Sequence, residues 1–427
     1  MTSNVIQIAP GDLLHWDYRI PRPTASKPLR IVQWNIERGY QLDGILRELA
    51  ALDADILLLQ ELDIQCSRTR FENVPMILAR ELKMECVFVC EFHELDCATR
   101  VTANRIDHSK GFHGNAILSR LDSCLVAEAF PHSFNLNWEQ FGKEVREPRI
   151  GQRYVLSASV TIRTSLPPLD GSFFITVLQL YSVHFEVFCG VLGRVRQLGD
   201  VLDHARTQQR EHGYRNRGDK QHGFSICVGG DFNTMAHGIV RMSFKYGTDR
   251  MKLLSLGETE AEWLQRTVLH VAPICSNING VVRNIYDWLW WRVLLGLSAR
   301  DVQKVQQQRD LYLFDAFDKR RDTTLDNPTY HGFVTGKFDW LLVSNVLVCN
   351  WGMGNHSYSL SDHKYLYKDV LFSPSLGYHS ANERYVVDQP QHWKTFFCSW
   401  LCRGLMCYAL MYFAMMILSY FAQIIVF

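Results

Sequence analysis

Apolar runs alternate with helical spacings along the first part of the chain. Residues 30–35 form an apolar run that ends in Trp34-Asn35, and residues 55–61 form a second run that ends in Glu61. Between them, leucine and isoleucine recur from residue 42 to residue 52 at the spacing of one helix face. This strand–helix–strand order predicts an α/β sheet with polar side chains at the ends of its strands.

The same pattern predicts further strands, several of which carry a polar side chain near one end. Asn115 lies near the start of one strand, His184 follows another, and Asp339 lies within a third. Two more stretches have helical spacing, and no internal repeat is present. The predicted strands are 86–90, 114–120, 154–162, 173–183, 226–230 and 336–344, and the predicted helices are 75–82 and 192–207.

Residues 226–233 are the stretch whose side chains most directly suggest catalysis. An apolar run ends in two glycines and then presents Asp231 and Asn233, two residues apart and therefore on one side of an extended segment. An acid that accepts a proton and an amide that holds an oxygen suit the attack of water on a phosphorus or carbonyl centre. The alternative interpretation is a simple turn.

The C-terminal residues have a different composition from the rest of the chain. Residues 404–427 contain no charged side chain and are long enough for one membrane-spanning helix. Trp400 and Arg403 lie just before this stretch, where interfacial anchors are common. We expect a membrane anchor over 396–427, and the alternative is a buried core helix.

These features predict four parts: an extended arm over 1–29, a catalytic domain over 30–372, a linker over 373–395 and the anchor. The first ten residues lack the basic and apolar regions of a signal peptide, and the 12 cysteines include no C-x-x-C pair. Free thiols are typical of a reducing compartment. We therefore expect a single-pass C-terminal anchor in an intracellular membrane, with the catalytic domain facing the cytosol.

Charge and aromatic content bear on the binding partner. The formal net charge is +1, so no global basic field attracts nucleic acid, although residues 146–153 and 206–222 predict basic loops. Trp288, Trp290 and Trp291 lie in an apolar stretch that suits a helix in a membrane interface. A helix packed on the core is the alternative for this stretch, and a solvated loop is the alternative for 206–222.

The polar side chains form an ordered series that resembles the endonuclease/exonuclease/phosphatase superfamily, the DNase I-like group. The resemblance covers about residues 30–372. It implies a two-sheet α/β sandwich with outer helices and a site at one rim, where Mg²⁺, or Mn²⁺ in its place, assists hydrolysis of a phosphoester. The motifs are Trp34-Asn35, Gln60-Glu61, Gly114-Asn115, His184, Asp231-Phe232-Asn233, Asp339 and Ser361-Asp362-His363.

The resemblance also implies a role for each of these side chains. It makes Glu61 the main metal carboxylate, helped by Asn35 and Asp362. The substrate-contact candidates are Asn115 and Arg153. The catalytic set is Asp231 to position or deprotonate water, Asn233 to orient the phosphate, His363 at the scissile phosphate, Asp339 behind His363, and His184 near the leaving group.

Three functions from different classes remain open at this stage. The first is a membrane-anchored phosphodiesterase of a phospholipid or sphingolipid head group, similar to neutral sphingomyelinases; the apolar tail, the tryptophans and His184 favour it. The second is a nuclease, such as a deadenylase-like RNA exonuclease or a DNase-like enzyme. The third is a non-catalytic membrane scaffold, which the intact polar series disfavours. No obligate protein partner is indicated.

Overall fold

A computed structural model describes most of the N-terminal unit of the chain. Contacts divide the chain into Met1–Gly377 and Tyr378–Phe427, and every described residue lies in the first unit. The predicted linker and anchor, Trp288 and Trp290 therefore lie outside the described residues. The described residues are 8–20, 28–97, 101–102, 105–106, 110–165, 173–215, 222–236, 259–269, 291–293, 295–326 and 334–372.

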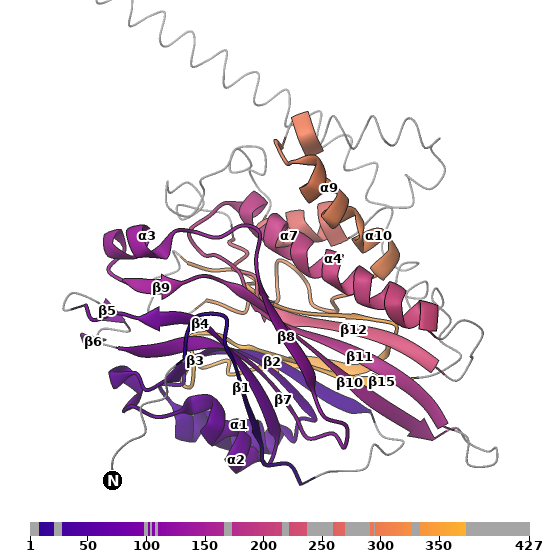
Figure 1. Cartoon of the computed structure of the whole chain (residues 1–427), viewed down its shortest axis with the longest axis horizontal. Helices are drawn as coiled ribbons and strands as arrows, with labels where there is room; N and C mark the ends of the chain where they lie inside the picture. The colour runs from indigo at the N-terminus through magenta and orange to yellow at the C-terminus, as the bar shows by residue number, and fades with distance from the viewer. Residues whose placement is uncertain are drawn as a thin grey trace, which may run out of the picture. The chain divides into compact units, whose positions relative to one another are not determined.

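Two sheets form the centre of the fold (Figure 1). The first follows the strand order β1-β4-β7-β3-β2-β15-β14, with β9 paired to β4. Its strands are β1 (Leu13–Asp17), β2 (Leu29–Arg38), β3 (Ile56–Ile64), β4 (Glu85–Glu94), β7 (Gly111–Ser119), β9 (Arg149–Gly151), β14 (Leu347–Gly354) and β15 (Tyr365–Leu371).

The second sheet follows the order β13-β12-β11-β10-β8. Only β11 and β12 are parallel neighbours within it, because α4 connects them. A separate hairpin joins β5 (Val101–Thr102) and β6 (Arg105–Ile106). The strands of the second sheet are β8 (Val126–Pro131), β10 (Tyr154–Ser165), β11 (Phe173–His184), β12 (His222–Asp231) and β13 (Asp339–Ser344).

Alternation along the strands places one hydrophobic cluster between the sheets and one on each outer face. In β3, Ile56 and Leu58 belong to the cluster that the two sheets share, whereas Leu57 and Leu59 belong to the cluster under the first two helices. Strands that are buried on both faces read as continuous apolar runs, which is why 55–61 has no polar alternation.

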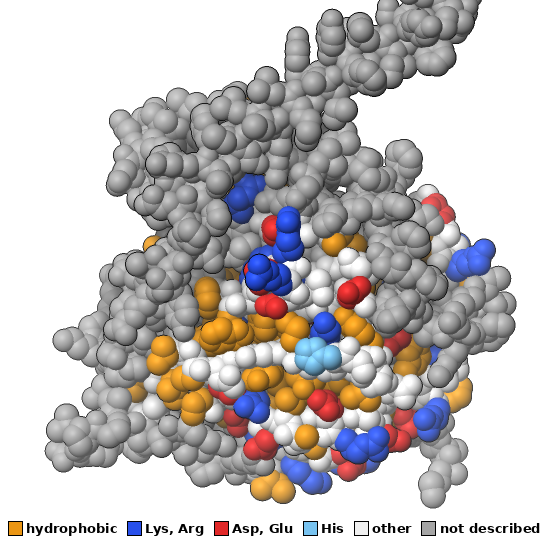
Figure 2. Space-filling view, turned by 180° about the vertical axis from the view of Figure 1, so that it is seen from behind, with side chains coloured by type: hydrophobic (Ala, Val, Ile, Leu, Met, Phe, Trp, Pro, Cys, Tyr) orange, Lys and Arg blue, Asp and Glu red, His pale blue; other side chains and the backbone are white. Residues whose placement is uncertain are grey.

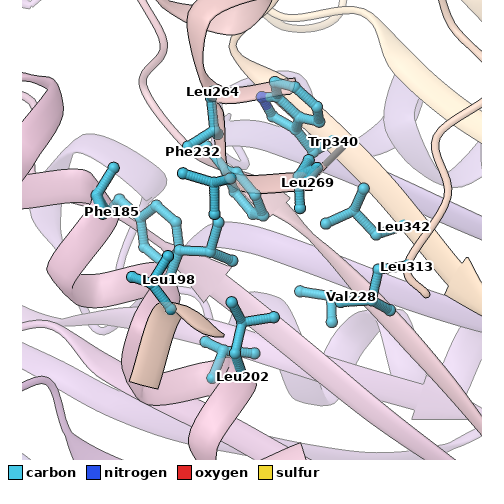
Figure 3. Packing of buried hydrophobic residues seen from close by; sticks show 14 of the residues in the cluster. Phe185, Leu198, Leu202, Val228, Phe232, Leu264, Leu269, Leu313, Trp340 and Leu342 are labelled. Atoms are coloured by element: carbon cyan, nitrogen blue, oxygen red, sulfur yellow. The ribbon is translucent and has the colours of Figure 1, made fainter. Parts of the chain in front are cut away.

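The helices cover the outer faces of the sheets. α1 (Leu42–Leu52) and α2 (Val74–Leu82) contribute to the cluster outside the first sheet, and α4 (Val191–Arg215) contributes to the cluster outside the second. Figure 3 shows Leu198 of α4 beside Phe185 and Phe232, in the cluster to which Leu202 and Trp340 also belong. The remaining helices are α3 (Trp138–Glu144), α7 (Glu260–Leu264) continued by a π-type turn (Gln265–Leu269), α9 (Ala299–Gln306), α10 (Gln308–Leu311) and a 3-10 turn (Ser67–Thr69).

Gly229 permits close approach of the two sheets next to the site. A Cβ atom built on Gly229 would lie 2.5 Å from Cδ1 of Leu58 and 3.3 Å from Cβ of Gln33, both on the first sheet. Any larger residue at 229 would therefore displace the Leu58 side chain or push the sheets apart. The α/β two-sheet sandwich is thus confirmed.

Several local predictions need correction. Residues 206–215, predicted as part of a loop, continue α4. One side of this helix is buried there, as Ala205 and Gln209 show. In the predicted basic loop 146–153, residues 149–151 form β9, and the side chains of Arg149 and Arg153 are buried. The predicted arm contributes β1, which pairs with β4.

The membrane predictions are only partly within the described residues. Trp291 is buried in the outer cluster of the second sheet, which agrees with core packing at that position. Among the helices that the structure describes, none combines the length and apolar character that a membrane crossing requires.

A buried polar tether on α4, the carboxylate of Asp200, connects this helix to Ser133 and to Lys304 of α9. The carboxylate of Asp200 accepts hydrogen bonds from the backbone N–H of Ser133 at 2.8 Å and from its hydroxyl at 2.9 Å, and it pairs with the ammonium group of Lys304 on α9. Burial alone would raise the pKa of Asp200, but hydrogen bonds from His132, Lys304 and Ser133 outweigh burial and lower the pKa to about 2.

This tether predicts a pH-dependent contribution to stability. Because the folded-state pKa is depressed, the stabilisation is present above about pH 4, the unfolded value, and is lost as the pH falls towards 2. Asp200→Asn should lower the free energy of unfolding at pH 6 by roughly 2 kcal/mol, with a smaller deficit at pH 3. Urea unfolding at both pH values measures this, with exposed Glu211→Gln on the same helix as the control. An equal deficit at both pH values would contradict it.

Candidate active site

Three neighbouring strands of the second sheet end in polar side chains. His184 is the last residue of β11 and lies opposite Asp231, the last residue of β12; Asp231 lies opposite Asp339, the first residue of β13. Residues directly opposite each other on paired strands share one face, so these side chains point the same way. Nε2 of His184 lies 3.4 Å from Oδ2 of Asp231.

The first sheet supplies the opposite wall. The side-chain amide of Asn35 on β2 donates to Oε1 of Glu61 at 3.2 Å and to Oδ2 of Asp231 at 3.1 Å, so this amide joins the two sheets. Glu61 lies in a bulge of β3 with a φ of 57°. Asn115 of β7 is paired opposite this bulge region and is fully buried.

A loop before β15 carries His363 into the site. The hydroxyl of Ser361 donates to the backbone carbonyl of Asn35 at 2.7 Å and accepts from the backbone N–H of His363 at 3.1 Å. The indole N–H of Trp34 and the amide of Asn355 both donate to the carbonyl of His363, at 3.0 and 2.7 Å. These bonds fix the backbone beneath the imidazole.

The imidazole of His363 lies between carboxylates. Its Nδ1 is 2.7 Å from Oδ2 of Asp339, and its Nε2 is 3.7 Å from Oδ2 of Asp231 and 4.0 Å from Oδ1 of Asp362. Burial lowers the pKa of His363, but the carboxylates of Asp339, Asp231 and Asp362 outweigh it and raise the pKa well above the ordinary value. His363 is therefore a cation at neutral pH, oriented by Asp339.

Asp231 and His184 are shifted in directions that suit proton transfer. Burial, against the His363 cation and with a contribution from Asp339, raises the pKa of Asp231 to about 7. Burial and the nearby Arg153 cation lower the pKa of His184 well below its usual range, so His184 is neutral. A carboxylate near neutral pKa is a competent general base, and a neutral imidazole can donate one hydrogen bond.

A second group of carboxylates lies beside the first. Burial, together with the carboxylates of Asp362 and Glu61 and against the Arg38 cation, raises the pKa of Glu37 to about 8. Burial also raises the pKa of Glu61, but Arg38 and the neighbouring histidines outweigh it and hold the pKa well below its usual range. A hard divalent cation would neutralise the mutual repulsion of these carboxylates, so Glu61, Glu37 and Asp362 are candidate ligands of Mg²⁺ or Mn²⁺.

The described acidic and histidine side chains also include a tighter group. Ligand atoms of Asp231, Asp339 and His363 all lie within 4.8 Å of one another. Because Asp339 and His363 are already hydrogen-bonded to each other, we assign this group to proton handling and the Glu61 group to the cation.

Asn233, Arg153 and Asn115 complete the set of predicted residues. The backbone N–H of Asn233 donates to Oδ1 of Asp231 at 2.8 Å and its amide donates to the carbonyl of Phe185 at 2.9 Å, so Asn233 supports Asp231. The guanidinium of Arg153 is buried and lies 2.8 Å from Glu91. Both polar atoms of the Asn115 amide are buried without a hydrogen-bond partner among the described residues, as expected of a group that awaits a ligand.

Sequence reasoning missed Glu37 and Gln33. Glu37 follows Asn35 by two residues in the same strand, and this spacing could have signalled a second acid at the site. Gln33 precedes Asn35 by two and donates to Gln60 at 2.8 Å and to Asp339 at 2.9 Å. A glutamine inside an apolar run was the available signal, since buried amides need partners.

Comparison with known proteins shows which family model the chain matches. A model of the Endonuclease/Exonuclease/phosphatase family matches residues 32–363. A search of curated proteins found no significant match. Among solved structures, an endonuclease/exonuclease/phosphatase from Beutenbergia cavernae DSM 12333 is 14% identical, with 81% of this chain and 72% of that chain covered and a TM-score of 0.41.

Two further solved structures are similarly distant. A 3'-5' exonuclease from Neisseria meningitidis is 16% identical, with 80% of this chain and 99% of that chain covered and a TM-score of 0.39. An AP endonuclease from Archaeoglobus fulgidus is 13% identical, with coverages of 81% and 99% and a TM-score of 0.31. The match of the family model over residues 32–363 is what carries the assignment.

The site predicts opposite titration of its two histidines. In metal-free protein, NMR of labelled histidine should find His363 protonated well above pH 6.5 and His184 neutral well below it. Asp339→Asn should lower the pKa of His363 towards its ordinary value, because the nearest opposing carboxylate is gone. Titration of His363 near pH 6.5 in the unmutated protein would contradict the arrangement.

Proposed function

The chain belongs to the Endonuclease/Exonuclease/phosphatase family, and on that premise we propose that it hydrolyses phosphoric esters with the help of a divalent cation. The observation that most supports this proposal is the hydrogen-bonded pair Asp339–His363, whose imidazole Nε2 faces Asp231. The carboxylate of Glu61 lies beside them, joined to Asp231 through the amide of Asn35. This combination provides a base, an acid and an anionic ligand set within one buried rim.

Asp231 is the base in this proposal. A water molecule that donates to Oδ2 of Asp231 can lose its proton to that oxygen as it attacks phosphorus. The backbone N–H of Asn233 and the amide of Asn35 hold the carboxylate in place at 2.8 and 3.1 Å. A pKa of about 7 keeps Asp231 close to balance between its two protonation states at neutral pH.

The two histidines and Asn115 can donate hydrogen bonds that stabilise the negative charge on the phosphate. Cationic His363 can donate from Nε2 to a phosphate oxygen, while Asp339 holds Nδ1. Neutral His184 and the unpartnered amide of Asn115 can donate further hydrogen bonds. A divalent cation held by Glu61, Glu37 and Asp362 would neutralise phosphate oxygens and stabilise the leaving oxygen.

We place the substrate in the membrane. The uncharged residues 404–427 support an anchor, and the formal net charge of +1 gives no general attraction for nucleic acid. On the face of the described residues drawn in Figure 2, basic and acidic side chains are intermixed. The favoured substrate is therefore a phospholipid or sphingolipid head group at an intracellular membrane, with the domain on the cytosolic side.

A nuclease is the second candidate. It is favoured by the partly exposed guanidinium of Arg38 beside Glu61, which could contact a phosphate backbone. A nuclease would lose activity steeply with added salt, because each phosphate contact releases a counterion. The third candidate, a scaffold, requires that the polar set has no catalytic use.

The test is hydrolysis by the full chain with Mg²⁺ and with EDTA, on phospholipid and sphingolipid vesicles and on single-stranded RNA. We expect metal-dependent release of the lipid head group. Asp231→Asn should reduce kcat by about 10²- to 10⁴-fold, because the base is lost while the site keeps its shape. The control is Glu211→Gln, which lies on an exposed part of α4.

The other outcomes separate the candidates. RNA cleavage with the same metal and Asp231 dependence would favour the nuclease. No hydrolysis of any phosphoester, together with an unchanged biological output in His363→Ala, would favour the scaffold and overturn the proposal.

A further inference from the structure

Four arginines, Arg38, Arg68, Arg149 and Arg153, lie in the neighbourhood of Glu61. They interact electrostatically with one another or with Glu61 and His184. Three of them have a carboxylate oxygen at short range, as expected for buried guanidinium groups. These contacts are Arg68 to Asp63 at 2.6 Å, Arg149 to Glu147 at 2.9 Å and Arg153 to Glu91 at 2.8 Å.

Arg38 differs from the other three. Its closest carboxylate oxygens belong to Glu61 at 3.7 Å and Glu147 at 3.8 Å, both beyond hydrogen-bond range. Its Nε, like that of Arg149 and Arg153, is buried without a hydrogen-bond partner among the described residues. Its side chain, however, is 17% exposed, against 3% to 6% for the other three. A guanidinium carries five N–H donors in a fixed fork, so this side chain has unused capacity for an oxyanion.

The backbone is held in a costly conformation to place Arg38 there. Glu37, Arg38 and Gly39 have φ values of 46°, 63° and 83° in succession, and the pairing of β2 with β3 shifts register between Asn35 and Arg38. L-residues avoid this left-handed region, and runs of it persist where the surrounding structure requires them, often at binding sites.

The two oxygens of Glu61 show on which side Arg38 lies. Oε1 accepts from Asn35, whose amide also donates to Asp231, whereas Oε2 is the oxygen nearest Arg38. Glu61 is thus joined to the base through one oxygen, and its other oxygen is the one nearest the guanidinium. A group bound by Arg38 would therefore lie on the Oε2 side of Glu61, beside the group that Asp231 serves.

Charge balance favours an anion at this place, because Glu147, at 3.8 Å, would be the remaining carboxylate near Arg38. Once a divalent cation neutralises Glu61, Arg38 loses its nearest opposing charge and lies beside another positive centre. A substrate phosphate on the Oε2 side of Glu61 would restore the balance and fill the guanidinium fork. A zwitterionic head group that ends in a quaternary ammonium would bring a third positive charge instead.

We propose that Arg38 binds a second phosphate of the substrate, adjacent to the ester that is cleaved, so that the enzyme prefers phosphorylated lipid head groups. This inference rests on the proposed function, because it names the substrate class of the same site. It makes Arg38 a specificity residue that acts mainly on binding, in contrast to Asp231.

The experiment compares vesicles of phosphatidylinositol with vesicles of phosphatidylinositol monophosphate, using the full chain and Mg²⁺. The unmutated protein should have the higher kcat/KM on the monophosphate. Arg38→Gln should lower kcat/KM on that lipid through KM, by roughly 10-fold more than it lowers kcat/KM on phosphatidylinositol. Arg38→Lys should fall between, because an ammonium group lacks the fork.

A matched control removes the same charge elsewhere. Arg80→Gln on α2 removes only the exposed pair with Glu81, at 2.8 Å, and should keep the preference intact. Equal losses on both lipids in Arg38→Gln would overturn the inference, because Arg38 would then only support Glu61. An unchanged preference, or Arg38-dependent cleavage of RNA without lipid cleavage, would also overturn it.

A binding measurement separates this inference from the proposed function. Calorimetry with Mg²⁺ should find that pyrophosphate, which carries two phosphates, binds roughly 10-fold more weakly to Arg38→Gln, while inorganic phosphate changes little. If no lipid is cleaved but this difference remains, the function fails and the second phosphate site stands. If pyrophosphate binds both proteins equally, the site fails whatever is hydrolysed.

Discussion

The site depends on hydrogen bonds that cross from one sheet to the other. Gln33 of β2 reaches Asp339 of β13 at 2.9 Å, Asn35 reaches Asp231 of β12 at 3.1 Å, and Gln60 of β3 reaches Ser182 of β11 at 2.9 Å. These groups are buried, and a buried donor or acceptor that loses its partner costs about 1–3 kcal/mol. The polar bridges therefore fix how the sheets meet, and Gly229 leaves the room for them.

The same strands anchor the site from its outer side. Phe185, Phe232 and Trp340 each follow a catalytic residue by one position, so they point to the opposite face of the sheet. Their rings stack in order, with centroids 4.5 Å apart between Phe185 and Phe232 and 5.6 Å apart between Phe232 and Trp340. Packing against α4 is thereby coupled to the positions of His184, Asp231 and Asp339 (Figure 3).

Hydrophobic periodicity and strand ends were readable in the sequence, whereas features that depend on tertiary contacts were not. The apolar runs located β2 and β3, and with them Asn35 and Glu61, because buried strands need uninterrupted hydrophobic residues. Arg153 was predicted as a substrate contact, yet its pairing with Glu91 of β4 depends on a partner 62 residues away. The left-handed turn at Glu37 and Arg38 had no local signal beyond Gly39, because non-glycine residues rarely adopt it.

The order of the site residues along the chain constrains when the protein can become active during synthesis. The bond from Gln33 to Asp339 spans 306 positions, and the bond from Trp34 to His363 spans 329. When α1, β3 and even β12 have emerged from the ribosome, Glu61 and Asp231 are present, but neither His363 nor Asp339 has been made. Contacts between residues this far apart in the sequence form late in folding. The candidate site therefore cannot assemble on a nascent chain until nearly all of the described fold has emerged.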